Sequence, residues 1–399
     1  MNQKKFDVLV VGAGLSGLLT AYSLSTKGLK IAIIDKGDFC NERNMGFDFR
    51  TTAISEGSKL FFDKIGFWKK ISKYSEPIKK IKVIDRDITN QIEFQNPEIK
   101  SFLGYIIKNY YIKKILIKEL KKIKNVFLYP LTNLSSIENL EDYVLSKTNS
   151  QIIKSKLLVA ADGKNSFVRQ LLKTTVFTKK YNHDALVINL NHKKNHNGVA
   201  YEIFSKFGPL AILPMKSNSK SNFSSSIVWS NDPNYFKSFL KTNNDIFRDI
   251  LQEKLEEYIG KIMKINDKKL FSLSAHINSS FYENQIVYIG DAAHSIHPIA
   301  GQGWNLGVRD IENLLNASEE AFELGLDLRD SFICKKYNEL CFKNSFMLYQ
   351  ITDKLNSVFL SDNFISKNIR KLGFDLIDKN LKINNFISSF AMGKNKLTA

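Results

Sequence analysis

Three glycines near the N-terminus have the spacing of a nucleotide-binding turn. Gly12, Gly14 and Gly17 follow the apolar run FDVLVV and open a stretch with helical character. In a strand–turn–helix unit they permit a tight turn, close approach of a phosphate, and close packing of helix on strand. Asp35 ends the next apolar run, where its carboxylate could accept hydrogen bonds from a ribose diol. The pattern favours a dinucleotide site over a ligand-free glycine turn, and it does not separate FAD from NAD.

A second glycine-rich stretch lies far downstream, in IVYIGDAAHSIHPIAGQGWNLGVRD. Gly290 permits a turn after a short apolar run, and the Asp291 carboxylate suits the hydroxyls of a ribityl chain. Gly301 and Gly303 allow close backbone approach, and a helix beginning near Gln302 points N–H groups toward the same space. Such a helix end stabilises the electron-rich edge of a flavin. The two motifs together predict one FAD-binding unit built from both ends of the chain.

A third segment with site character is AADGKNSFVR, residues 160–169, which also follows an apolar run. Asp162 and Gly163 would form a turn that opens a helix, and Arg169 would lie far enough along it to steer a phosphate. The alternative is an ordinary helix that Asp162 caps. The segment therefore supports the FAD prediction without establishing it.

Two histidines beside the second motif are candidates for a proton-transfer role. His294 and His297 could act as a general base, although a structural role is favoured because no substrate geometry is known. No cysteine or third histidine lies near them, so we expect no metal site. Aromatic residues farther upstream could pack a core or line a pocket, and these are Tyr201, Phe204, Phe207 and Trp229.

Hydrophobic periodicity indicates the elements that must position these residues. Strands are predicted at residues 6–11, 29–34, within 78–94, 126–130, 152–161, within 182–230, and 286–289. Helices are predicted at residues 14–27, 104–123, 245–264 and 302–323, and in most of the chain from there to about residue 380. The strand–helix–strand start predicts a βαβ unit, and the strand-rich middle predicts a separate sheet.

The predicted fold class is α/β: a Rossmann-like FAD-binding domain with a parallel sheet, interleaved with a mostly antiparallel β-sheet substrate domain, plus C-terminal helices. Residues 1–75, 98–180 and 275–330 are expected to form the FAD-binding domain, residues 76–97 and 181–274 the substrate-binding β-sheet domain, and residues 331–399 the C-terminal helical region.

The charge and composition limit the partners of the chain. Its 399 residues carry a net charge of +18, mostly from widely spread lysines. With no nucleic-acid motif, we expect no nucleic-acid partner, and we expect attraction to an anionic membrane surface. No apolar run reaches the about 20 residues of a membrane helix, and no signal-peptide pattern is present. With three scattered cysteines, the expectation is a cytoplasmic protein that can lie peripherally on the inner membrane.

These motifs give the chain a resemblance to the class A FAD-dependent aromatic monooxygenases, and within them to the ubiquinone-biosynthesis hydroxylases. The resemblance covers nearly the whole chain and includes DFRTTAISEGSKLFFDKIGFW (48–68) and GPLAILPM (208–215). One departure is Lys108-Asn109-Tyr110, where the family often has an acidic-Asn-Arg run. The motifs and the resemblance together give these cofactor-binding residues: Gly12, Gly14, Gly17, Asp35, Arg50, Asp162, Gly163, Gly290, Asp291, Pro298, Gly301, Gln302, Gly303 and Asn305.

The resemblance implies an enzyme that uses FAD, NAD(P)H and O₂. It implies hydroxylation of the aromatic ring of a polyprenylphenol through a flavin C4a-hydroperoxide, beside other ubiquinone-biosynthesis proteins. No catalytic residue is assigned from the sequence. The alternatives are a hydroxylase of another aromatic substrate, a prenyl-chain reductase, and a flavoprotein scaffold in a biosynthetic complex. A flavin halogenase is disfavoured because the chain contains no WxW motif.

Overall fold

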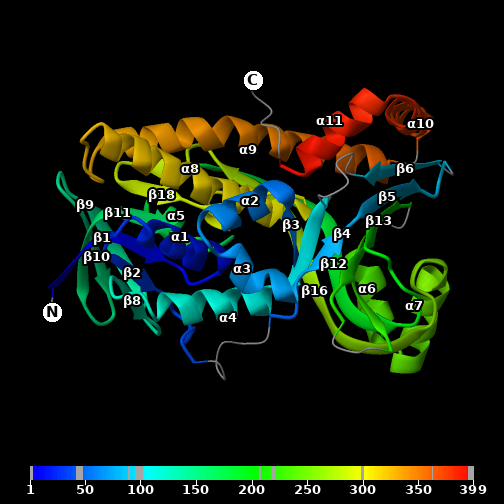
Figure 1. Ribbon diagram of the computed structural model, residues 1–399. Helices are drawn as coiled ribbons and strands as arrows, with labels where there is room; N and C mark the ends of the chain where they lie inside the picture. The colour runs from blue at the N-terminus through cyan, green and yellow to red at the C-terminus, as the bar shows by residue number, and fades with distance from the viewer. Residues whose placement is uncertain are drawn as a thin grey trace.

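The computed structural model describes residues 3–41, 48–88, 90–95, 102–205, 208–217, 221–297, 301–361 and 363–393. Two large sheets occupy opposite ends of an elongated molecule, and the long helix α9 (Ser331–Leu360) runs above both (Figure 1). Helix α8 (Gly303–Glu323) lies beneath α9 and beside the N-terminal helix α1 (Leu15–Ser25). Segments from the two halves of the sequence are therefore packed together.

The first sheet is built on five parallel strands in the order β18, β11, β1, β2, β8. Their interior residues are almost all buried and apolar, as expected for a parallel sheet covered on both faces. An antiparallel hairpin extends this sheet at β11, and β17 pairs with β18. The strands are β1 (Gln3–Val11), β2 (Ile31–Ile34), β8 (Val126–Tyr129), β9 (Leu134–Asn139), β10 (Val144–Thr148), β11 (Ile152–Ala160), β17 (Tyr282–Glu283) and β18 (Ile286–Tyr288).

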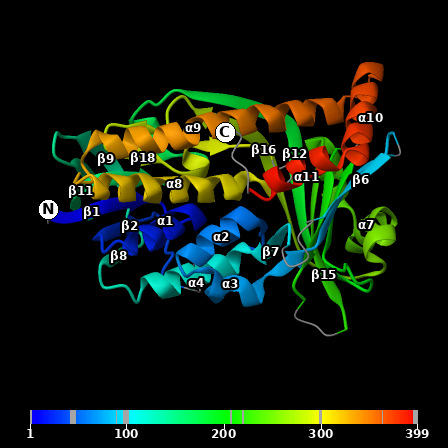
Figure 2. The same cartoon turned by 45° about the horizontal axis from the view of Figure 1, so that its top comes forward.

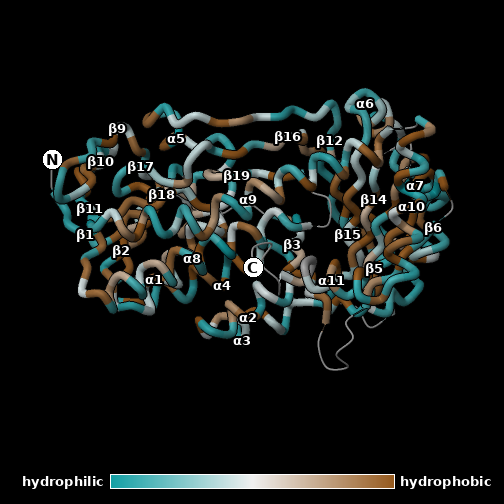
Figure 3. The backbone as a smooth tube through the Cα atoms, turned by 90° about the horizontal axis from the view of Figure 1, so that it is seen from above, coloured by the Kyte–Doolittle hydropathy of each residue, from teal (hydrophilic) through white to brown (hydrophobic). Residues whose placement is uncertain are grey.

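The second sheet has the order β19-β16-β12-β15-β14-β13-β5-β6, and only its β13–β5 pair is parallel. Figure 3 shows hydrophobic stretches along its central strands. Helices α6 (Pro233–Lys241) and α7 (Asn244–Ile259) cover one face and form a hydrophobic core with it. The strands are β5 (Lys80–Asp85), β6 (Asn90–Gln95), β12 (Val176–His192), β13 (Val199–Phe204), β14 (Leu210–Met215), β15 (Phe223–Asn231), β16 (Ile262–Asn278) and β19 (His294–Ser295).

A small antiparallel sheet, β3-β7-β4, lies between the two large ones (Figure 1). Its strands are β3 (Thr51–Ser55), β4 (Glu76–Ile78) and β7 (Gly104–Lys108). The remaining helices are α2 (Glu56–Lys64), α3 (Trp68–Ile71), α4 (Asn109–Leu120), α5 (Phe167–Leu171), α6 (Pro233–Lys241), α7 (Asn244–Ile259), α10 (Phe364–Lys379) and α11 (Leu381–Ala391), with 3₁₀ turns at Ser72–Tyr74 and Gly290–Ala292. Among the described residues, no helix combines the length and the apolar composition needed to cross a bilayer.

The predicted fold class is confirmed, and two element predictions are corrected. Residues 104–108 form strand β7 rather than the start of a helix, and α4 begins only at Asn109. The helix predicted at 245–264 ends at Ile259, because Gly260 takes a positive φ of 65° and breaks it. The long strand β16 that follows was not predicted, since lysines interrupt its apolar alternation.

Candidate functional site

Predicted site residues follow the carboxyl ends of four neighbouring parallel strands. Gly12 follows β1, Asp35 follows β2, Asp162 lies just after β11, and Gly290 lies just after β18. Carboxyl ends of parallel strands meet at one edge of a sheet, which is where α/β folds bind ligands. The structure thus brings the three sequence motifs together at a single edge.

The first glycine turn combines tight packing with one open position. A Cβ added at Gly12, whose φ is 107°, would overlap the carbonyl oxygen of Ala161. One added at Gly17 would overlap the Gly12 carbonyl oxygen. At Gly14 an added Cβ would meet nothing within 4 Å. The outer two glycines therefore fit helix, strand and neighbouring loop together, and the middle one leaves room for a ligand.

Asp35 holds the first glycine turn to the end of β2. Its Oδ2 accepts a 2.7 Å hydrogen bond from the Ala13 backbone N–H, and its Oδ1 accepts one of the same length from Gly37. The residue is half-buried, and each carboxylate oxygen keeps a lone pair beyond the one that these bonds use. Asp35 can therefore accept a further hydrogen bond from a diol while it fixes the turn.

Asp162 supports the start of helix α5. Its Oδ2 accepts hydrogen bonds from the N–H groups of Phe167 and Val168, at 2.7 and 3.1 Å. The N-cap itself is Ser166, whose hydroxyl accepts a hydrogen bond from the Arg169 backbone N–H in the first turn. Asp162 Oδ1 is buried and has no hydrogen-bond partner among the described residues. One carboxylate oxygen is thus structural, and the other is left for water or a ligand.

Arg169 donates hydrogen bonds to backbone carbonyl groups of the protein. Its guanidinium donates to the carbonyl oxygens of Lys164 and Ala292, at 2.6 and 3.1 Å, and lies 3.2 Å from His276 Nε2. The pKa of His276 is lowered to about 4, mainly by burial of the ring and to a smaller extent by the positive charge of Arg169. Arg169 therefore ties the segment after β11 to the segment after β18, and a role in steering a phosphate stays a prediction.

The second glycine motif packs directly on the first. A Cβ added at Gly290 would lie 2.7 Å from Ser16 Oγ in α1, and one at Gly307 would lie 3.2 Å from the Gly290 Cα. Asp310 Oδ2 accepts a 2.9 Å bond from the Gly290 N–H and lies 2.7 Å from His294 Nε2. Burial alone would lower the pKa of His294, but the Asp310 charge and hydrogen bond raise it. His294 therefore has a structural role here.

Asp291 and Arg50 place opposite charges near each other. The Asp291 side chain keeps exposed area, yet surrounding protein raises the pKa of its carboxyl despite the nearby His294 and Arg50 charges. Arg50 forms a fork-like pair with Asp48, at 2.7 and 2.8 Å, and lies 5.4 Å above the Phe271 ring. Its hydrogen bond to Asp48 raises the pKa of Arg50. A cation, an anion and an aromatic face are thus gathered between the two large sheets.

The start of α8 meets β3. Gly301 has a φ of 62°, Gln302 is the N-cap residue, and an added Cβ at Gly303 would meet nothing within 4 Å. Asn305 is buried, and its Oδ1 accepts hydrogen bonds from the Ser55 N–H and the Ser58 hydroxyl. Its Nδ2 donates to the carbonyl oxygens of Ala53 and Gly301. Its side chain thus joins α8 to β3, so any support of a ligand is indirect. Pro298 lies outside the described residues.

The residues at this edge fit FAD. Open space lies where side chains would project at Gly14, Gly163 and Gly303, so a ligand can contact the backbone there. The first turns of α1 and α8 leave N–H groups without intrahelical partners, which suits a pyrophosphate and an electron-rich ring edge. The half-used Asp162 carboxylate supplies a polar partner. The combination is the donor and acceptor set that a dinucleotide requires.

His297 differs from His294 in having no polar partner. It is buried, both ring nitrogens lack hydrogen bonds among the described residues, and its ring meets Tyr181 edge to face at 4.8 Å. Burial lowers the pKa of His297 to about 4. The imidazole is therefore neutral near pH 7 and packs as an aromatic ring.

The second sheet has one closed face and one partly open face. The closed face carries Trp229, which packs on α6. The direct cross-strand row Val83–Glu202–Ala211–Val228 lies on the other face, and all four side chains keep exposed area in the middle of the sheet. This open face meets the segment before β3, since Asn189 on it donates a 2.7 Å bond to the Phe49 carbonyl oxygen.

Glu202 is the one ionisable side chain in that four-residue row, and sequence reasoning missed it. Its carboxylate has no hydrogen bond or ion pair with a described residue, and although the side chain is only half-buried by surface area, desolvation by the surrounding protein raises its pKa to about 7. The other row members are apolar. A carboxyl group that is half ionised near neutral pH can accept a proton from a bound ligand.

The aromatic candidates of the second sheet divide between packing roles. Trp229 belongs to the core with α6 and α7, and Tyr201 packs on Tyr258 of α7 at 4.8 Å. Phe204 stacks on Phe359 of α9 at 3.7 Å. Phe207 lies outside the described residues. The described aromatics therefore hold helices against the sheet.

Comparison with known proteins identifies the family of this chain. Residues 5–318 match the protein family described as the FAD binding domain. The chain belongs to this family. FAD is thus the cofactor that the family implies, in agreement with the fit of the strand-end residues. The predicted resemblance is confirmed as well, because the relatives with similar sequences carry hydroxylase and monooxygenase names.

Proteins with similar sequences align with almost the whole of this chain. The ubiquinone hydroxylase UbiL of Rhodospirillum rubrum is 28% identical over 99% of this chain and 91% of that protein. The mitochondrial ubiquinone biosynthesis monooxygenase COQ6 of Schizosaccharomyces pombe is 27% identical over 97% of this chain and 92% of its own length. The p-nitrophenol 4-monooxygenase PnpA of Pseudomonas putida has a similar structure, with a TM-score of 0.81, 17% identity and full coverage of both chains. That structural likeness establishes the fold.

Proposed function

We propose that this protein is an FAD-dependent monooxygenase that hydroxylates the aromatic ring of a polyprenylphenol in ubiquinone biosynthesis. One ring C–H becomes C–OH, O₂ supplies the oxygen, NAD(P)H supplies two electrons, and the second oxygen atom leaves as water. The observation that carries the proposal is the near-complete alignment with proteins named ubiquinone hydroxylase and ubiquinone biosynthesis monooxygenase. The strand-end site that suits FAD supports it.

The cofactor-binding residues are those at the strand ends and at the start of α8. When bound, FAD supplies electron transfer from NAD(P)H to O₂ and transfer of one oxygen atom to the ring. Gly14 and Gly303 let backbone N–H groups reach it, and Asp35 and Asp291 bind hydroxyls of its ribose and ribityl parts. Arg50 contributes positive charge, since Asp48 and Phe271 hold its guanidinium in place.

The open face of the second sheet is the substrate side. Glu202 accepts a hydrogen bond from the phenol hydroxyl and takes its proton as the ring is attacked, because an ionised phenol is more electron-rich at carbon. The neighbouring Ala211 and Val228 leave apolar space for the ring and the first part of a prenyl tail. The hydrogen bond from Asn189 to the Phe49 carbonyl oxygen links this face to the backbone next to Arg50.

The proposed division of the chain follows from these roles. Residues 1–75, 98–180 and 275–330 bind FAD, residues 76–97 and 181–274 bind the substrate, and residues 331–399 form the C-terminal helical region. Separate hydrophobic cores for the two large sheets support the division. We also propose NAD(P)H as the reductant, other ubiquinone-biosynthesis proteins as partners, and a peripheral position on the inner membrane, which the net charge of +18 favours.

The test is rescue of bacterial hosts that lack their own ubiquinone ring hydroxylases, deleted one at a time. Ubiquinone and its precursors are measured by mass spectrometry in air and without O₂. Restoration that requires air is expected, and the rescued strain identifies the ring carbon. A soluble, FAD-loaded protein that rescues no strain would overturn the proposal and favour another aromatic substrate or a scaffold role.

A further inference from the structure

Helix α10 is anchored to the second sheet through a buried charge pair. Arg370 Nε lies 2.8 Å from Asp85 Oδ2 at the end of β5, and both side chains are 1% exposed. The same guanidinium donates to the carbonyl oxygens at the end of α9, those of Val358, Phe359 and Ser361. Phe374, one turn farther along, is also buried. These contacts fix which side of α10 faces the protein.

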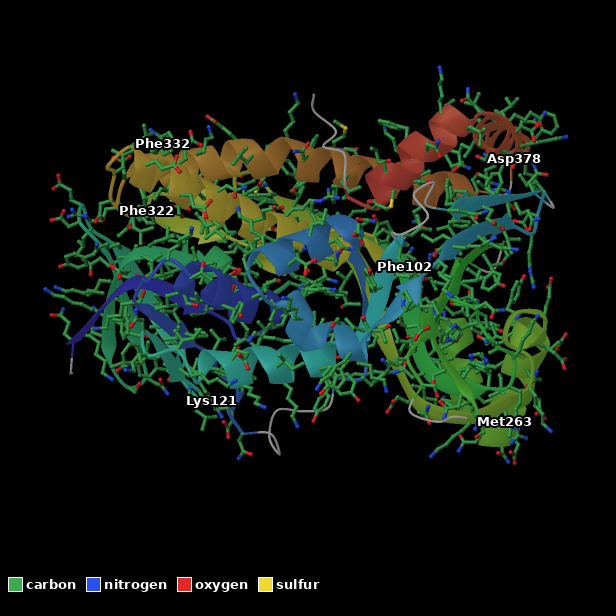
Figure 4. All side chains as sticks on the ribbon, viewed as in Figure 1. Phe102, Lys121, Met263, Phe322, Phe332 and Asp378 are labelled. Atoms are coloured by element: carbon green, nitrogen blue, oxygen red, sulfur yellow. The ribbon has the colours of Figure 1, made fainter. Side chains whose placement is uncertain are left out.

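The outward side of α10 is apolar. Ile365, Ile369, Leu372 and Leu376 recur at spacings of four, three and four residues, so they share one face of the helix. Their exposed fractions run from 52% to 69%, and other exposed apolar residues beside them are Phe364, Leu381 and Phe386. A surface helix normally turns this stripe toward the core. Here the polar Arg370 faces inward and the apolar stripe faces outward (Figure 4 labels Asp378 on this helix).

Basic side chains border the stripe. Lys371, Lys379 and Lys382 are exposed, against one exposed acidic residue, Asp378, in the same stretch. The chain as a whole carries +18. A second copy of this surface would bring lysines toward lysines, whereas an anionic membrane would neutralise them. We infer that α10 and α11 form a docking surface for an anionic lipid membrane, with the apolar stripe inserted at the headgroup level.

This membrane-docking surface lies next to the open face of the second sheet. Helices α10 and α11 lie beside β6 (Figure 2), and Asn384 of α11 donates to the Glu93 carbonyl oxygen at 3.2 Å. Phe359, which borders α10, stacks on Phe204, two residues from Glu202. A prenylated substrate dissolved in the bilayer would thus meet the protein on the side of the second sheet that carries Phe204 and Glu202. That delivery role rests on the proposed function, whereas the membrane contact does not.

Flotation of the purified, FAD-loaded chain with vesicles tests the inference without any turnover. We expect binding to vesicles of phosphatidylcholine with phosphatidylglycerol, and weaker binding at high salt or without the anionic lipid. Replacing Ile369, Leu372 and Leu376 together by serine should lower vesicle binding at least about tenfold, because less apolar surface inserts. The matched control is Leu60→Ser, Ile246→Ser and Leu324→Ser, which removes equally exposed apolar residues elsewhere and should bind as the wild type.

Thermal unfolding and the FAD absorbance check that both triple variants are folded. Equal vesicle binding by the wild type and the α10 variant would overturn the inference, as would a wild type that binds neither kind of vesicle. A wild-type dimer that becomes monomeric in the α10 variant, with no vesicle binding, would assign the stripe to a second copy of the chain. If the protein binds no vesicles but still hydroxylates the ring in detergent, the membrane-docking inference is overturned and the proposed function is retained.

Discussion

Asp310 Oδ2 lies 2.7 Å from His294 Nε2 and accepts a 2.9 Å hydrogen bond from the backbone N–H of Gly290. One carboxylate, buried in α8, therefore fixes both the turn that follows β18 and the histidine at β19. Since Gly290 also packs on Ser16 of the first motif, this pair helps to hold the two ends of the chain together at the cofactor site.

Removing the charge of Asp310 should destabilise the protein in a pH-dependent way. Because the pKa of His294 is raised above 6.5 in the folded chain, the stabilisation from its protonated form is complete below that value and is lost as pH rises through the raised pKa. Asp310→Asn should cost about 3 kcal/mol near pH 6 and less at pH 9. Denaturant unfolding at both pH values measures this, and an equal cost at both would contradict the charge pair.

The two glycines of the first turn should respond differently to alanine. At Gly14 the added methyl group meets open space, so Gly14→Ala should keep the fold but weaken FAD binding at least about tenfold by blocking close approach. At Gly12 the positive φ and the overlap with Ala161 should cost about 2–4 kcal/mol of stability. FAD titration and thermal unfolding of both variants check this. Wild-type FAD affinity in Gly14→Ala would place the cofactor elsewhere.

Glu202→Gln should slow hydroxylation about 100-fold, as expected when a proton acceptor is lost. The wild-type rate should rise with pH through about 7, the raised pKa of Glu202, and the variant should lack that rise. FAD affinity should stay unchanged, since the residue lies on the second sheet. Glu138→Gln, a change at an exposed residue of β9, is the matched control and should keep the wild-type profile.

The same substitution has a stability signature that does not require turnover. Burial raises the pKa of Glu202 from 4.5 to about 7, so the stability that the neutral carboxyl gives is complete below pH 4.5 and is lost as the pH rises to about 7. Glu202→Gln should therefore be more stable than the wild type at pH 8, by roughly 1–3 kcal/mol, and no more stable at pH 4.5. A variant that is less stable at pH 8 would indicate that the carboxylate has a polar partner.

The strand-end residues could be predicted because short-range patterns determine them. Gly12, Asp35 and Gly290 each follow a short apolar run that is typical of a buried strand, and parallel strands bring such residues to one edge of the sheet. Asp310 ends the predicted FAD motif GQGWNLGVRD. Its role depends on a hydrogen bond with Gly290, in a turn twenty residues upstream. Only the packing of α8 on that turn reveals it.

Features that depend on contacts between distant parts of the chain could not be predicted from the sequence. Glu202 sits in an alternating strand like any exposed carboxylate, and only the pairing with β14 and β5 shows that its row is apolar. The apolar stripe of α10 reads as an ordinary core face until the Arg370–Asp85 pair shows which side is inward. Residues 104–108 were assigned to a helix because their apolar run continues into α4.

Oxygen-18 labelling of the purified protein would show whether it transfers an oxygen atom from O₂ to an aromatic ring. The FAD-loaded chain is mixed with NAD(P)H and a prenylphenol precursor under oxygen-18 gas, and the product is examined by mass spectrometry. We predict one new hydroxyl group on the ring, carrying an oxygen-18 atom, with NAD(P)H consumed only when substrate and O₂ are present. A ring product without the label, or none from a fully FAD-loaded protein, would contradict it.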